Sequence, residues 1–199
     1  MKKTVMFLGF FIALVILFWV LLSKYSKALD KKIITISNVK KFSFINYNGS
    51  IINNETVKNK VYVAGFFFST CTGICPQMND YLKNIVYGKY KNDSNFCILS
   101  HTVTPQIDDT IKLKKYADSI GVTTNNWYFL TGSKASIYEA ARTSYTVDDP
   151  KNNLDDATLL HTQYVALVDK QQRVRAIYDA TKKVELVECT KKIEELLKE

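Results

Sequence analysis

The stretch Phe66-Phe67-Phe68-Ser69-Thr70-Cys71-Thr72-Gly73-Ile74-Cys75-Pro76-Gln77-Met78 decides the fold, because a strand pattern changes into a helix pattern there, at two cysteines. The preceding run, Val61–Phe68, is β-branched, aromatic and apolar, which predicts a strand buried on both faces of an α/β sheet. A helix is expected from near Pro76, since proline fits a first helical turn. Its apolar face recurs at helical spacing, at Met78, Tyr81, Leu82, Ile85 and Val86.

Cys71 and Cys75 are expected in the turn between this strand and this helix, at the end of the sheet. Unpaired N–H groups and the positive end of the helix dipole favour thiolate over thiol there. Gly73 permits backbone conformations closed to other residues, and the short spacing lets the two side chains meet as a disulfide or as two ligands of one metal ion. The alternative, two inert buried cysteines, is disfavoured by their close pairing in such a turn.

An uninterrupted apolar run, Val5–Leu22, stands near the N-terminus with lysines on both sides. It approaches the roughly 20 residues that span a bilayer as a helix. A single-span membrane protein is therefore expected, with residues 1–24 as a cytoplasmic tip and transmembrane anchor and residues 25–40 as a tether. A signal peptide cleaved near Ser26-Lys27-Ala28 is the alternative. The flanking lysines do not decide the orientation, since large domains cross membranes despite such charges.

The formal net charge of +8 comes from lysines scattered along the chain. No basic stripe alternates with aromatic residues and no nucleic-acid-binding motif is present, so no nucleic-acid partner is expected. Residues 41–199 contain no internal repeat or low-complexity tract, and their length is that of one domain.

The pattern of predicted elements indicates a sheet flanked by helices. In order, it predicts a hairpin over 42–52 turning at Asn48-Gly49, a strand over 96–99, a helix over 110–120 ending at Gly121, a strand over 127–130, a helix from Ser133 to about Arg142, a polar loop over 148–156, a hairpin over 163–179 and a helix over 184–197. This order matches an α/β fold with a thioredoxin-like, mixed central sheet.

The chain has two histidines. The strand over 96–99 should run parallel to Val61–Phe68, because a helical crossover joins them, so His101 should reach the same end of the sheet as the cysteines. His161 precedes the C-terminal hairpin, where a ligand role is favoured over that of a hydrogen-bonded structural histidine. Cys97, in a buried strand, and Cys189, in the C-terminal helix, have no cysteine partner nearby in sequence and are interpreted as structural.

Three motifs together resemble the Sco/SenC family: Cys71-Thr-Gly-Ile-Cys75-Pro76 after a buried strand, Val103-Thr104-Pro105 followed by Asp108, and His161 before a hairpin carrying Leu167-Val168-Asp169. The resemblance runs from Phe42 to the C-terminus. The chain departs from the family pattern at Thr104, where the family has an aspartate before the proline.

Members of that family are membrane-anchored, thioredoxin-like copper proteins needed to assemble cytochrome c oxidase. The resemblance implies a metallochaperone that delivers copper to the binuclear copper site of cytochrome c oxidase subunit II. It also implies a domain that faces the periplasm from the bacterial inner membrane, or the equivalent intermembrane-space side. Another copper chaperone or a thiol-disulfide reductase is a further candidate partner.

The proposed ligands are Cys71, Cys75 and His161, and Cys71 and Cys75 would form a disulfide without metal. Two thiolates and one imidazole make a soft site that suits Cu(I) and holds Cu(II) with an added ligand. Structural zinc normally needs a fourth protein donor. His101 is a candidate for that donor, or for a residue that supports a ligand. Together with the resemblance, the donor set favours copper over zinc.

Two enzyme functions are alternatives. A thiol-disulfide oxidoreductase acting through Cys71 and Cys75 usually has a Cys-x-x-Cys spacing and a proline before the strand that faces the cysteines. Here the spacing is longer and His161 stands where that proline would be, which favours metal binding over disulfide exchange. A peroxidase needs an arginine beside its reactive thiol. Of the arginines, Arg142, Arg173 and Arg175, none has a suitable position in the sequence.

Overall fold

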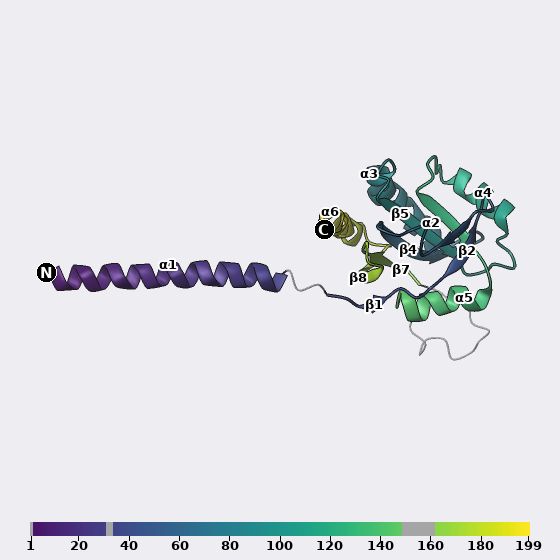
Figure 1. Ribbon diagram of the computed structural model, residues 1–199. Coiled ribbons are helices and arrows are strands. Elements are labelled where there is room, and N and C mark those ends of the chain that lie inside the picture. Colours follow the sequence, from purple (N-terminus) through teal and green to yellow (C-terminus); the bar gives the residue numbers. More distant parts are fainter. Residues whose placement is uncertain (1, 31–33, 149–161) are drawn as a thin grey trace. The chain divides into compact units, whose positions relative to one another are not determined.

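The structure, a computed structural model, describes residues 2–30, 34–148 and 162–199 and contains two units, Met1–Ile34 and Thr35–Glu199 (Figure 1). The first unit contains helix α1 (Lys2–Asp30). Large apolar side chains along it, including Phe11, Phe18 and Trp19, are exposed. Counting only the residues whose placement is described, no helix reaches the length and hydropathy that a membrane span requires.

Among its described residues, the second unit is built on one mixed sheet of eight strands. β4, β5 and β6 are parallel to one another, and the other neighbouring strands are antiparallel. The strands are β1 (Ser37–Asn38), β2 (Ser43–Asn46), β3 (Ile51–Asn53), β4 (Val61–Phe67), β5 (Phe96–Thr102), β6 (Trp127–Thr131), β7 (Tyr164–Val168) and β8 (Arg173–Asp179), in the spatial order β1-β8-β7-β4-β5-β6-β2-β3. The predicted mixed, thioredoxin-like sheet is confirmed.

Helices cover both faces of the sheet (Figure 1). On one face, α2 (Ile74–Tyr81), η1 (Leu82–Tyr87), α4 (Thr110–Ser119) and α6 (Lys183–Lys198) pack on what we call the α2-side core, which includes Val63, Phe67, Met78, Leu113 and Ile193. α3 (Gly88–Tyr90) continues η1. On the other face, α5 (Lys134–Glu139) and η2 (Ala140–Ser144) pack on the α5-side core, which includes Phe44, Phe66, Leu99, Ile137 and Tyr145.

The central strand behaves as its apolar composition predicts. All residues of β4 are buried, because a parallel strand is covered by helices on both faces. Alternation along the strand then assigns each side chain to one core: Val63 and Phe67 face the α2-side core, and Tyr62 and Phe66 face the α5-side core.

The predicted turns and caps are also confirmed. The hairpin β2–β3 turns at Asn48-Gly49, where Gly49 has a φ of +83°, in the left-handed region that favours glycine. Ser133 caps α5 by accepting a hydrogen bond from the Ser136 amide at 3.1 Å. Gly121, with a φ of +74°, follows the end of α4. The helix predicted from near Pro76 begins slightly earlier, at Ile74.

The structure differs from the predicted tether, residues 25–40. Helix α1 continues to Asp30, and the second unit already begins at Thr35. Ser37 of β1 pairs with Val174 of β8, and the Ile36 amide donates to the Val174 carbonyl at 2.8 Å. A strand this short has no periodicity to read, and the unpaired edge of β8 supplies its partners. Apart from Asp148, the predicted polar loop 148–156 lies outside the described residues.

Candidate functional site

The two predicted thiol ligands lie where the strand passes into the helix. β4 ends at Phe67, and Cys75 lies in the first turn of α2, which begins at Ile74. The Cys71 amide donates to the Phe68 carbonyl at 3.2 Å, which makes a tight turn at the start of the loop. Both thiols are free; Cys71 is partly exposed and Cys75 is buried in the α2-side core.

The two sulfurs are brought together and differ in acidity. Burial raises the pKa of Cys71, but hydrogen bonds from the Cys75 thiol and from the backbone amides of Cys75, Gly73 and Ile74 outweigh it, so that the pKa lies below its usual value. Those amides form the N-terminus of α2, as the sequence predicts. Burial and the hydrogen bond to Cys71 raise the pKa of Cys75 to about 12. Cys71 is therefore the accessible thiol that ionises first.

Two further residues of the site, Tyr116 and Asn79, were not singled out from the sequence. The Tyr116 ring of α4 stacks on Phe67 with a centroid separation of 5.0 Å, and its hydroxyl accepts a hydrogen bond from the Asn79 amide group at 2.7 Å. Burial raises the pKa of Tyr116 to about 12, and the charges of Cys75 and Cys71 add to that shift. In the sequence, Tyr116 looks like any apolar position of an amphipathic helix.

His101 is not placed beside the thiols. β5 extends to Thr102, so His101 lies within the strand, and its fully buried ring packs in the α5-side core against Phe44, Phe66 and Tyr145. Its Nδ1 lies 3.2 Å from the Gly65 carbonyl oxygen. The end of the sheet that His101 reaches is the one predicted, but the alternation of side chains along β5 directs the ring to the face opposite Cys75.

His161 lies outside the described residues, so its predicted ligand role stays a prediction. Thr162, the next residue, is described: its hydroxyl donates to the Val147 carbonyl at 2.7 Å. β7 follows at Tyr164 and runs antiparallel to β4, with Ala166 opposite Ala64. Thr162 and Gln163, which lead into β7, are therefore at the end of the sheet at which β4 leads into the cysteines. Within the described part of the chain, no three His, Cys, Asp or Glu side chains gather as a metal site.

Cys97 and Cys189 stay away from the site. Cys97 lies in the α5-side core and Cys189 in the α2-side core, both with no exposed surface. Burial raises the pKa of Cys97 to about 12 and that of Cys189 further still. Both therefore remain protonated thiols, in line with the structural role predicted for them.

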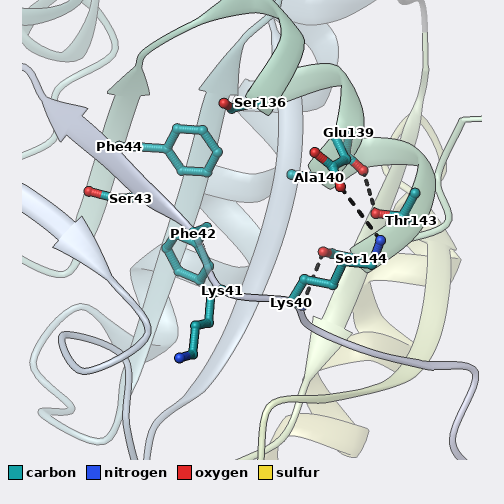
Figure 2. A pocket seen from close by; sticks show the side chains of 10 residues that line it. All are labelled: Lys40, Lys41, Phe42, Ser43, Phe44, Ser136, Glu139, Ala140, Thr143 and Ser144. Atoms are coloured by element: carbon teal, nitrogen blue, oxygen red, sulfur yellow. Dashed lines mark hydrogen bonds and ion pairs between the residues drawn. The ribbon is translucent and has the colours of Figure 1, made fainter.

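A cavity of about 270 Å³ lies between the chain before β2 and helices α5 and η2. Figure 2 shows Lys40 reaching Glu139, with which it forms an ion pair at 3.5 Å, while the Lys40 amide donates to the Ser144 hydroxyl at 3.2 Å. Phe42 and Phe44 form the wall opposite these groups. None of its lining residues is a cysteine or histidine, so the cavity is separate from the thiol pair.

Known proteins resemble this chain in both sequence and fold. A SCO1 protein homolog of Bacillus subtilis is 30% identical over 142 residues, which cover 71% of this chain and 73% of that protein. The structure of BsSco, a member of the Sco family of cytochrome c oxidase assembly proteins in which a disulfide switch has been identified, superposes with a TM-score of 0.70 and 26% identity over 83% of this chain and 96% of that one.

The copper-bound structure of Bradyrhizobium japonicum ScoI has the same fold, with a TM-score of 0.58 and 18% identity over 81% of this chain and all of that one. The model of the SCO1/SenC family matches residues 31–198, which include the cysteine loop, the strands beside it and the chain up to the C-terminal helix. The chain therefore belongs to the SCO1/SenC family.

Proposed function

We propose that this protein is a copper metallochaperone that binds the ion between Cys71, Cys75 and His161 and passes it on during oxidase assembly. One observation carries the proposal: in a chain of this family, the two thiols meet at the N-terminus of α2, one acidic and partly exposed, the other buried. Copper bound to the related ScoI and the assembly role of the Sco family support it.

The chain's own residues account for capture and release. Cys71 offers an accessible sulfur, whose negative charge the amides of α2 stabilise. Cys75 keeps its proton until a cation arrives and displaces it, because only a positive charge nearby offsets the cost of a buried thiolate. Two soft sulfurs and an imidazole favour Cu(I), and a partner's thiols can replace them one at a time.

The proposal includes a cellular location and a partner. The apolar run Val5–Leu22 supports a single membrane anchor in the bacterial inner membrane, with the thiol domain in the periplasm or on the equivalent intermembrane-space side. The recipient would be the binuclear copper site of cytochrome c oxidase subunit II, in keeping with the assembly role of the family.

Copper stoichiometry tests the proposal directly. The reduced full chain should bind one Cu(I), and Cys71→Ser or Cys75→Ser should abolish stoichiometric binding, because a two-donor site remains. Cys97→Ala, which removes a thiol on the far face of the sheet, is the control and should bind normally. A Cys71→Ser, Cys75→Ser double variant that still bound one copper would refute the proposal.

A thiol-disulfide oxidoreductase that keeps partner cysteines reduced is the second candidate, favoured by the acidic, partly exposed thiol of Cys71. His161→Ala separates the two functions. Copper delivery requires the imidazole, whereas disulfide exchange does not. In cells that lack the native protein, loss of oxidase activity with an unchanged reduction potential of the cysteine pair supports copper delivery. Retained oxidase activity supports the oxidoreductase.

A further inference from the structure

Asp108 is a buried acid beside the cysteine loop, with no exposed surface. Its carboxylate accepts hydrogen bonds from the Ser69 amide at 3.1 Å and from the Ser69 hydroxyl. It also accepts hydrogen bonds from the hydroxyl of Thr104 at 3.0 Å and from that of Thr102. All these partners are hydroxyl or amide donors, so the carboxylate acts as a polar junction.

The junction joins two segments that are distant in sequence. Ser69 lies in the loop after β4, two residues before Cys71, while Thr102 is the last residue of β5. On the second segment, the Thr104 amide donates to the Thr102 hydroxyl at 3.1 Å, and the Asp108 amide donates to the Thr104 carbonyl at 2.8 Å. The turn after β5 is thus folded around the Asp108 carboxylate, and this carboxylate binds Ser69 of the other segment.

The junction lies on the same face of the sheet as the thiols. Thr102 alternates along β5 in phase with Phe96 and Ile98, which belong to the α2-side core together with Cys75. Tyr116 gives a second indication: after burial, its pKa is raised by the charges of Cys75, Cys71 and Asp108. Tyr116 therefore lies within electrostatic reach of Cys71, Cys75 and Asp108.

We propose that Asp108 is a positioning residue for the cysteine pair: by holding Ser69 against the end of β5, it fixes Cys71 at the distance from Cys75 that chelation and disulfide formation both need. Cys75 is already fixed by α2, whereas Cys71 lies in a loop that is attached through Ser69 to this carboxylate. The part of the inference that concerns copper rests on the proposed function, and the part that concerns the disulfide does not.

Loosening Ser69 should weaken both reactions of the pair. Disulfide formation with oxidised glutathione turns two protein thiols into one S–S bond and yields two molecules of reduced glutathione, so its equilibrium constant reports how close the protein sulfurs are held. Chelation of Cu(I) depends on the same proximity. Residues that orient metal ligands typically contribute about 10- to 100-fold to metal affinity.

The experiment compares the full chain with Asp108→Asn and Ser69→Ala. Asn keeps the shape of Asp but has one acceptor oxygen fewer, and Ala at position 69 removes one donor while leaving the carboxylate in place. Asp109→Asn is the matched control, because Asp109 is a neighbouring N-cap that accepts from the Lys112 amide at 2.8 Å, and Asn caps helices equally well. The glutathione equilibrium constant is measured for each protein, together with Cu(I) affinity by competition with a chromogenic chelator.

Asp108→Asn should lower both constants about 10-fold, Ser69→Ala should lower both to a smaller extent, and Asp109→Asn should change neither. An effect of Asp108→Asn without one of Ser69→Ala would overturn the inference, since it would assign the effect to charge instead of position. Unchanged constants in both variants would overturn it as well. Should Asp108→Asn fail to fold, the two constants of Ser69→Ala alone test the inference, and unchanged constants in that variant would overturn it. Should the wild-type chain bind no copper, the proposed function fails, while the glutathione equilibrium still tests Asp108.

Discussion

Burial makes a histidine and a cysteine of this protein chemically inert, although both residue types are often reactive. Fully buried among aromatic rings, His101 has its pKa lowered to about 4, because burial penalises the imidazolium. Cys97, on the same face of the sheet, has its pKa raised to about 12 for the same reason. By contrast, Cys71 is kept acidic by hydrogen bonds at a helix N-terminus. Local environment therefore separates the reactive thiol from chemically similar groups elsewhere in the chain.

His101 should make folding stability depend on pH. Its pKa of about 4 in the folded chain lies below its ordinary value of 6.5, so the unfolded chain binds a proton that the folded chain does not. Stability contributed by the neutral ring is complete above pH 6.5 and is lost as the pH falls towards 4. The loss should amount to about 3 kcal/mol over that window.

Urea unfolding at pH 7 and at pH 4.5 measures this contribution. The stability of His101→Leu should change less between these two pH values than that of the wild-type chain. This holds even if imperfect packing of the leucine, or the lost contact with the Gly65 carbonyl, lowers its stability at both pH values. Other titrating groups cancel in the comparison. Equal sensitivity of the two proteins would show that His101 is not buried as a neutral ring.

At the scale of elements, the site depends on how β4, α2 and β7 meet. β4 leads into the cysteines, α2 supplies the amides that stabilise Cys71, and β7 begins shortly after His161. Thr162, two residues before β7, is attached to Val147 by its hydrogen bond to the Val147 carbonyl. If His161 is a ligand, this bond helps to place it.

Thr162→Val should therefore weaken copper binding without changing the cysteine pair. Valine keeps the shape of threonine but cannot donate to the Val147 carbonyl, so the segment next to His161 loses an attachment. We expect Cu(I) affinity to fall by about 10-fold while the glutathione equilibrium of the thiols stays the same. Thr162→Ser keeps the hydroxyl and is the control. A change in the glutathione equilibrium, or an unchanged affinity, would contradict the prediction.

At the scale of the whole molecule, the chain divides into the N-terminal unit Met1–Ile34 and the thiol domain Thr35–Glu199. If the N-terminal unit is a membrane anchor, the full chain should sediment with membranes and resist extraction with alkaline carbonate. Leu14→Lys combined with Ile16→Lys should abolish this, because two central charges cost about 5 to 7 kcal/mol on insertion scales. Lys2→Gln is the control. Release of the wild-type chain by carbonate would exclude an anchor.

The sequence by itself determined the strand–cysteine–helix unit, the hairpin at Asn48-Gly49, the extent of α4 and the start of α5 at its Ser133 cap. These features depend on local periodicity, turn residues and caps, which act between residues close together in the chain. The same reasoning named Cys71 and Cys75 as the reactive pair, because their spacing and their place before a helix are local too.

The tertiary structure alone decided which face His101 occupies, where β1 pairs and what Asp108 contacts. His101 is directed away from the thiols because β5 continues to Thr102, which a short apolar run does not reveal. Ser69 and Asp108 are 39 residues apart, and their contact exists only because β4 and β5 are parallel neighbours that end together. The unequal acidity of the two thiols likewise follows from burial and hydrogen bonds that only the assembled sheet and helices create.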